Sequence, residues 1–105
     1  MLVEIGKTTD VPEGEARAFD ANGTRIAVVN LGGGEFRAVG DLCSHAQGFL
    51  SEGEVDVGEC TIECPRHGAT FDLETGAART LPATAPVAAF AVKVEGETVL
   101  VEMEG

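Results

Sequence analysis

The sequence lacks long apolar runs and has few basic residues. No stretch is long and apolar enough to predict a membrane-spanning helix. The 7 Lys and Arg residues are outnumbered by 18 Asp and Glu residues, which gives a net charge of −11. Proteins that bind nucleic acid need a basic face, so this composition argues against that class. We therefore expect neither nucleic acid nor a membrane as a partner.

Cysteine and histidine are also scarce, with three and two residues in the chain. Three cysteines cannot all pair, so a disulfide framework is improbable. The N-terminal residues 1–6 contain no basic region followed by an apolar stretch, so we expect no export signal and a cytoplasmic location. With 105 residues, the chain is long enough for one domain with a modest core.

Both histidines lie in a pattern that pairs each of them with a cysteine. Cys43 and His45 form the first pair, spaced C-x-H, and Cys64 and His67 form the second, spaced C-x2-H. The residues between the pairs are enough for a hairpin that brings them together. Two thiolates and two imidazoles are the ligands of a mixed-ligand iron–sulfur cluster or of a structural zinc. Zinc modules usually pair Cys with Cys and His with His, so mixed pairs favour the iron–sulfur cluster.

This pattern, followed by Gly68, resembles the Rieske family of 2Fe-2S proteins. The resemblance implies one 2Fe-2S cluster, with Cys43 and Cys64 on one iron and His45 and His67 on the other. The likeness continues in three further segments: Gly48-Phe49-Leu50-Ser51-Glu52-Gly53, Phe71-Asp72 and Leu81-Pro82-Ala83. In the family, a proline-bearing loop such as the last of these covers one side of the cluster.

Outside the motif, alternating and β-branched segments predict an all-β fold. The strongest hairpin signal lies around Glu95-Gly96-Glu97, and no segment keeps a helical period over ten residues. We predict a Rieske-like antiparallel β-sandwich base from residues 1–40 and 75–105, with residues 41–74 inserted as a small cluster-binding lobe. The expected strands are residues 2–5, 15–19, 24–30, 35–39, 90–94 and 98–103, with turns at 20–23 and 32–34.

Three positions differ from the Rieske proteins of respiratory complexes. Gly48 and Arg66 occupy the places of two cysteines that form a disulfide there, and Ala69 replaces a serine that donates a hydrogen bond to the cluster. A tyrosine donor is also missing, since the chain has no tyrosine. Fewer donors stabilise the reduced cluster less, so we predict a reduction potential near the low end of the Rieske range, about −150 mV.

These differences point to the soluble ferredoxins of bacterial ring-hydroxylating dioxygenases. We expect an electron carrier, not an enzyme, that takes one electron from a flavin-dependent reductase to a terminal oxygenase. No histidine remains for a mononuclear iron site. A small subunit of a nitrite-reductase-like oxidoreductase, an accessory protein of iron–sulfur assembly and a zinc-stabilised interaction module remain alternatives. We expect a monomer.

Two features between the Cys-His pairs leave both a structural and a functional interpretation open. Cys60 lies in an expected strand over 59–64, and is either a small buried residue or an alternative ligand or redox thiol. The acidic residues of this stretch are either a solvated surface or a docking surface for basic patches on redox partners. They are Glu52, Glu54, Asp56, Glu59 and Glu63.

Overall fold

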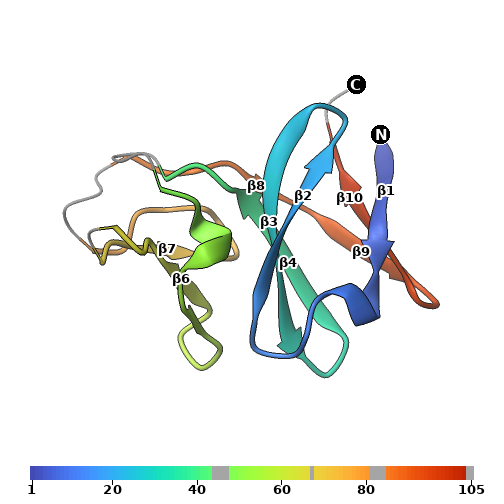
Figure 1. Cartoon of the computed structure of the whole chain (residues 1–105), viewed down its shortest axis with the longest axis horizontal. Helices are drawn as coiled ribbons and strands as arrows, with labels where there is room; N and C mark the ends of the chain where they lie inside the picture. Colours follow the sequence, from blue (N-terminus) through green and yellow to red (C-terminus); the bar gives the residue numbers. More distant parts are fainter. Residues whose placement is uncertain (44–47, 67, 81–84, 104–105) are drawn as a thin grey trace.

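The computed structural model describes residues 1–43, 48–66, 68–80 and 85–103. In this part of the chain the regular structure is almost entirely antiparallel β, which confirms the predicted fold class (Figure 1). None of the described helices is long and apolar enough to cross a membrane. The strands are β1 Leu2–Lys7, β2 Ala16–Ala21, β3 Thr24–Gly32, β4 Glu35–Gly40, β5 Val55–Asp56, β6 Thr61–Glu63, β7 Thr70–Asp72, β8 Ala89–Phe90, β9 Val92–Glu95 and β10 Thr98–Glu102, and the 3-10 helices are η1 Thr8–Asp10 and η2 Leu50–Glu52.

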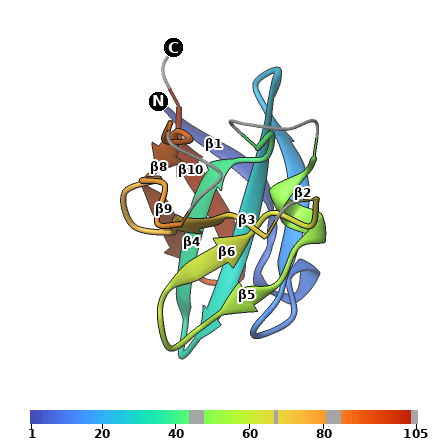
Figure 2. The same cartoon turned by 90° about the vertical axis from the view of Figure 1, so that its left-hand side faces the viewer.

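The strands form three sheets, two of which make a base and one a lobe. The base sheets have the orders β1-β10-β9 and β2-β3-β4-β8, so both ends of the chain contribute to the base. The third sheet, β5-β6-β7, belongs to the lobe at the left of Figure 1 and faces the viewer in Figure 2. The predicted arrangement, a β base with a small inserted lobe, is confirmed.

Strand β3 lies at the centre of the molecule and is buried on both faces. Ile26 and Val28 point toward the other base sheet, whereas Ala27 and Val29 point toward the lobe, and all four are fully buried. Successive side chains of a strand point to opposite faces. A strand covered on both sides therefore shows an apolar run instead of alternation, which is why the sequence here lacks a polar face.

The two faces of this sheet belong to two separate cores. The base core lies between the base sheets, and the interface core lies between the base and the lobe. The buried members of the base core are Val11, Ala21, Ile26, Val28, Phe36, Ala38, Val99, Val101 and Met103. Those of the interface core are Ala16, Ala27, Val29, Val39, Cys43, Leu50, Ile62, Cys64, Ala69, Phe71, Leu73 and Val87.

Three hairpins of the base agree with the predicted turns. Asn22 and Gly23 have φ of 55° and 89°, which is the positive-φ pair of a two-residue hairpin turn. Asp20 remains in β2, where its carboxylate accepts a hydrogen bond of 2.9 Å from the Gly23 N–H, so the turn is shorter than the predicted 20–23. Gly32 is the last residue of β3, so only Gly33 and Gly34 connect β3 to β4, one residue fewer than the predicted turn at 32–34. Strands β9 and β10 pair on either side of Gly96 and Glu97.

The prediction of a strand over residues 59–64 was too long. Strand β6 begins at Thr61, because Cys60 has a φ of 56° and lies in a turn. The Cys60 N–H donates to the Val57 carbonyl at 3.3 Å, and its carbonyl accepts from the Leu73 N–H at 2.9 Å. Its side chain is half-buried against the interface core, and this burial raises the pKa of the thiol.

Candidate metal centre

The first loop, residues 42–49, carries the predicted ligands Cys43 and His45. Its neck is closed by an antiparallel bridge between Leu42 and Phe49 and by a hydrogen bond of 2.9 Å from the Cys43 N–H to the Gly48 carbonyl. Cys43 is buried in the interface core. His45 lies outside the described residues.

The second loop, residues 64–69, connects β6 to β7 and carries Cys64 and His67. The Cys64 N–H donates to the Ala69 carbonyl at 2.7 Å, and the Gly68 N–H donates to the Cys64 carbonyl at 3.0 Å. Gly68 has a φ of +76°, a conformation that glycine adopts without strain. These bonds hold Cys64 at the base of the loop with its side chain fully buried. His67 and the predicted proline-bearing loop at 81–83 lie outside the described residues.

The two loops meet at Gly48. A Cβ atom at this position would lie 3.4 Å from the Cys64 Sγ and 2.6 Å from the Arg66 Cγ. Because Gly48 is also hydrogen-bonded to Cys43, it touches both predicted cysteine ligands. The structure therefore brings the two cysteines together in one buried region. Within the described residues, which include neither histidine, no group of three or more Cys, His, Asp or Glu side chains is arranged to hold a metal ion.

A turn after β7 stabilises the lobe next to the second loop. The backbone N–H groups of Glu74 and Thr75 donate to the Asp72 carboxylate at 2.7 and 3.1 Å, and Arg79 donates to it at 3.0 Å. Burial by itself raises the pKa of Asp72, but these hydrogen bonds and the charge of Arg79 together lower it. Residues 77–79 run beside β7 and pair with it through the Phe71–Ala78 bridge.

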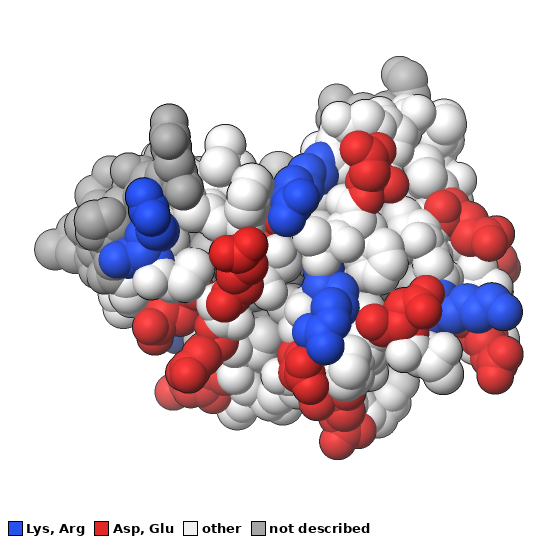
Figure 3. Space-filling model, in the orientation of Figure 1, with Lys and Arg blue, Asp and Glu red and all other residues white. Residues whose placement is uncertain are grey.

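The surface of the lobe is acidic. The five acidic residues predicted between the Cys-His pairs are all exposed, and none forms an ion pair with a described residue. Arg66 is the only Lys or Arg between residues 41 and 74 of the sequence. Figure 3 shows acidic side chains spread over one face of the molecule, with basic side chains set singly among them.

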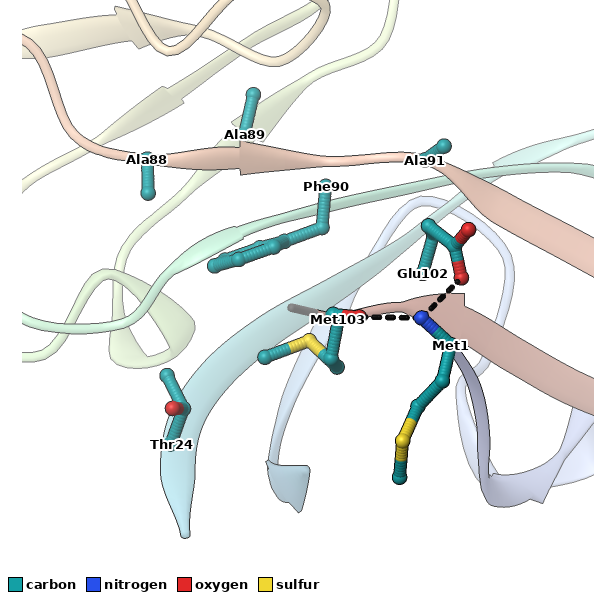
Figure 4. Close-up of a pocket in the computed structure, with 8 residues that line it drawn as sticks. All are labelled: Met1, Thr24, Ala88, Ala89, Phe90, Ala91, Glu102 and Met103. Atoms are coloured by element: carbon teal, nitrogen blue, oxygen red, sulfur yellow. Dashed lines mark hydrogen bonds and ion pairs between the residues drawn. The ribbon is translucent and has the colours of Figure 1, made fainter. Parts of the chain in front are cut away.

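A hollow at the chain termini is separate from the two loops. It lies between β8 and the end of β10, where the Met1 ammonium group donates to the Met103 carbonyl at 2.6 Å and pairs with Glu102 at 3.1 Å (Figure 4). None of the predicted ligands lines it. The lining residues are Met1, Thr24, Ala88, Ala89, Phe90, Ala91, Glu102 and Met103.

Comparison with known sequences identifies the family. The sequence profile of the Rieske [2Fe-2S] domain matches residues 1–91, a range that includes both loops. The chain belongs to the Rieske [2Fe-2S] family. A Rieske domain holds one 2Fe-2S cluster, so the cofactor predicted from the sequence is confirmed.

Three similar proteins are named as ferredoxins or ferredoxin subunits, two of them from dioxygenases. The 3-phenylpropionate/cinnamic acid dioxygenase ferredoxin subunit of Escherichia coli K12 is 46% identical over 94 residues, which are 90% of this chain and 86% of the relative. The ferredoxin of carbazole 1,9a-dioxygenase from Nocardioides aromaticivorans IC177 is 36% identical, with a TM-score of 0.93 and 99% of each chain covered. A ferredoxin of Sphingomonas yanoikuyae B1 is 30% identical, with a TM-score of 0.88 over 99% of this chain and 100% of that chain.

The described part of this Rieske domain fits a 2Fe-2S cluster. Two buried cysteines come from separate loops into one region. Gly48 lies next to the Cys64 sulfur, where any side chain would point toward that atom. Thiolate sulfur is the usual ligand of iron–sulfur clusters. Two residues beside the first loop, Arg25 and Asp41, were not singled out from the sequence. The only signal there was a carboxylate two positions before Cys43, which by itself has no distinctive pattern.

Proposed function

We propose that this Rieske protein carries single electrons to the terminal oxygenase of a ring-hydroxylating dioxygenase system. The observation that carries this proposal is the likeness to dioxygenase ferredoxins, which extends over nearly the whole chain. The similar proteins are named as ferredoxins or ferredoxin subunits, so the protein is an electron carrier within a larger enzyme system and not an enzyme by itself.

We propose that Cys43 and Cys64 hold one iron and that His45 and His67 hold the other. When bound, the cluster supplies a centre that gains and loses one electron. The burial of both cysteines in the interface core supports their part of this assignment, because it keeps water away from the thiolate side. We also propose that residues 41–74 form the cluster-binding lobe.

The electron acceptor is proposed from a solved complex. A structure of reduced oxygenase with oxidised ferredoxin in carbazole 1,9a-dioxygenase contains a chain 33% identical to this one, with a TM-score of 0.84 over 98% of this chain and 97% of that chain. We propose a terminal oxygenase as acceptor by this likeness. A flavin-dependent reductase as donor, a monomeric state and a cytoplasmic location stay predictions from the sequence.

The nitrite-reductase alternative has weaker support. The putative small subunit of a nitrite reductase has a TM-score of 0.85 but is only 20% identical, so this likeness concerns the fold alone. No feature of the described residues favours that role over the dioxygenase ferredoxin.

A single-turnover experiment tests the proposal. The purified ferredoxin is reduced photochemically and mixed, without oxygen, with the oxidised oxygenase of the E. coli 3-phenylpropionate/cinnamic acid dioxygenase or of another ring-hydroxylating system. We expect the paramagnetic signal of the reduced ferredoxin to decay while the oxygenase becomes reduced. A reduced ferredoxin that passes electrons to nitrite reductase but to no ring-hydroxylating oxygenase contradicts the proposal.

A further inference from the structure

Asp41 is the only charged residue buried among those that the structure describes, and it directly precedes the first loop. It follows the last residue of β4 and stands two residues before Cys43. Its side chain is fully buried, with an exposed fraction of 0%. A buried carboxylate is costly unless it is paired and hydrogen-bonded, so its presence here requires specific partners.

Both the side chain and the backbone of Asp41 are bonded across the neck of the first loop. The carboxylate accepts a hydrogen bond of 2.7 Å from the Ser51 N–H, and the Asp41 carbonyl accepts one of 2.7 Å from the Leu50 N–H. Residues 50 and 51 come directly after the loop. Asp41 therefore joins the chain entering the loop to the chain leaving it.

Arg25 supplies the opposite charge and contacts both sides of the same neck. Its Nε donates to the Asp41 carboxylate at 2.5 Å, and its guanidinium lies 3.9 Å from the centre of the Phe49 ring. The Arg25 carbonyl also accepts from the Asp41 N–H at 3.2 Å. Asp41 is at the entrance of the loop and Phe49 is at its exit, so one guanidinium from β3 braces both ends.

We propose that Arg25 and Asp41 are positioning residues that fix the first loop and set the charge next to the metal centre. This inference rests on the proposed ligand role of Cys43, whose N–H is bonded within the same neck. The pair is neutral as a whole. Removal of Arg25 leaves the buried Asp41 carboxylate, two residues before Cys43, without its positive partner, and removal of the Asp41 charge leaves the half-exposed Arg25 guanidinium without its negative partner.

The two single variants must therefore shift the reduction potential in opposite directions. Reduction adds an electron, so an uncompensated negative charge nearby disfavours it and an uncompensated positive charge favours it. We expect Arg25→Gln to lower the potential and Asp41→Asn to raise it. The double variant, which is again neutral, should return close to the wild-type potential. A purely structural role has no reason to produce shifts of opposite sign.

The experiment measures the potential of each holoprotein by redox titration followed by paramagnetic resonance, with all proteins at one fixed pH. Lys93→Gln is the matched control for Arg25→Gln, because it makes the same change in net charge on β9, in the base sheet that lies away from the lobe. Arg25→Lys keeps the charge but loses the flat guanidinium. We expect its potential to stay nearer to wild type, while its cluster is still lost faster than in the wild type, by about tenfold.

Each outcome decides the inference. Shifts in the same direction, or shifts no larger than that of Lys93→Gln, overturn it. If Arg25→Gln does not retain a cluster, the other two variants still separate the effect of charge from that of geometry. Asp41→Asn changes the charge of the pair, whereas Arg25→Lys keeps the charge and changes only the shape of the donor. Cys43→Ser separates this result from an error in the ligand set: if that variant keeps a normal cluster, the ligand assignment fails, whatever the Arg25 variants show.

Discussion

Gly48 lies directly against the sulfur of Cys64, so close that an added Cβ atom would be 3.4 Å from the Sγ. The same Cβ would be 2.6 Å from the Cγ of Arg66, which covers the glycine. By the resemblance to respiratory Rieske proteins, these two positions correspond to cysteines that form a disulfide there. Here the loops are held by a close contact between a glycine and an arginine stem, with no covalent bond between these positions.

This contact predicts a coupled effect of two substitutions. Gly48→Ala should lower the free energy of unfolding by about 1–3 kcal/mol, because the new methyl group overlaps the Arg66 stem. Arg66→Ala opens that space, so the double variant should recover most of the loss. Urea unfolding of the four proteins measures the coupling. Strictly additive losses would show that the stem does not contact Gly48.

The three cysteines provide a direct test of the ligand set. Cys43→Ser and Cys64→Ser should lose the 2Fe-2S cluster, because each removes a proposed thiolate ligand. Cys60→Ser should keep it, since Cys60 lies in a turn at the edge of the interface core. Iron content per chain and the visible spectrum measure the result. Loss of the cluster in Cys60→Ser alone would show that the ligand set is wrong.

Local sequence patterns were sufficient to predict most of the base. Strand β3 was recognisable because both of its faces are apolar, and the β9–β10 hairpin because a glycine lies between two alternating segments. The predicted strand over 59–64 was too long because Cys60 has a positive φ and lies in a turn. The backbone of Cys60 is hydrogen-bonded there to Val57 and to Leu73, and Leu73 is distant in sequence. Alternation of residue types carries no signal for such a contact.

The site shows the same limit. The four proposed ligands follow a recognisable spacing, but the Arg25–Asp41 pair beside the first loop does not. Arg25 and Asp41 are 16 residues apart in sequence and come together only because β3 and β4 pair in one register. A charged residue beside an apolar run is ordinary at the end of a strand. Only the complete burial of Asp41 shows that the residue has a special role.

Gly76 controls the junction between the lobe and the base. It has a φ of +79°, and a Cβ there would be 2.0 Å from the Val87 carbonyl oxygen. This oxygen is a backbone atom, so it cannot move aside as the end of a flexible side chain could. Gly14 has a φ of +80° with nothing within 4 Å, so it is a matched control for the backbone conformation alone. Gly14→Ala should cost about 1 kcal/mol, and Gly76→Ala clearly more.

Urea unfolding of the two variants measures the difference between them. Because both positions carry the same positive φ, the excess loss in Gly76→Ala reports the overlap with Val87. Equal losses would mean that the chain at residue 87 moves away without cost, and that this close approach does not fix the lobe on the base.

The lowered pKa of Asp72 predicts that this residue contributes to the free energy of unfolding in a way that depends on pH. Its pKa in the folded protein lies below the ordinary value of about 3.9, so the ionised carboxylate stabilises the fold above that pH. The contribution is lost as the pH falls through the folded-state pKa. Asp72→Asn should be less stable near neutral pH and should lose less stability on acidification.

Unfolding of Asp72→Asn and wild type is compared between neutral pH and the acid range. Glu4→Gln is the control, since the Glu4 side chain is exposed on β1 and forms no ion pair with a described residue. We expect it to follow the wild-type curve. An acid slope as steep in Asp72→Asn as in the wild type would mean that the hydrogen bonds from Glu74, Thr75 and Arg79 do not stabilise the carboxylate in solution.

Ala69 offers a test of the predicted low reduction potential. It is fully buried directly after Gly68, and its carbonyl accepts the Cys64 N–H at 2.7 Å, so a side chain added here lies next to the proposed thiolate ligand. By the resemblance to respiratory Rieske proteins, a serine at this position donates a hydrogen bond to the cluster. That bond is stronger to the more negative, reduced state, so Ala69→Ser should raise the potential. Ala78→Ser, beside β7, controls for a new hydroxyl elsewhere in the lobe and should leave the potential unchanged. An unchanged or lower potential in an Ala69→Ser protein with an intact cluster would show that the missing donor does not account for a low potential.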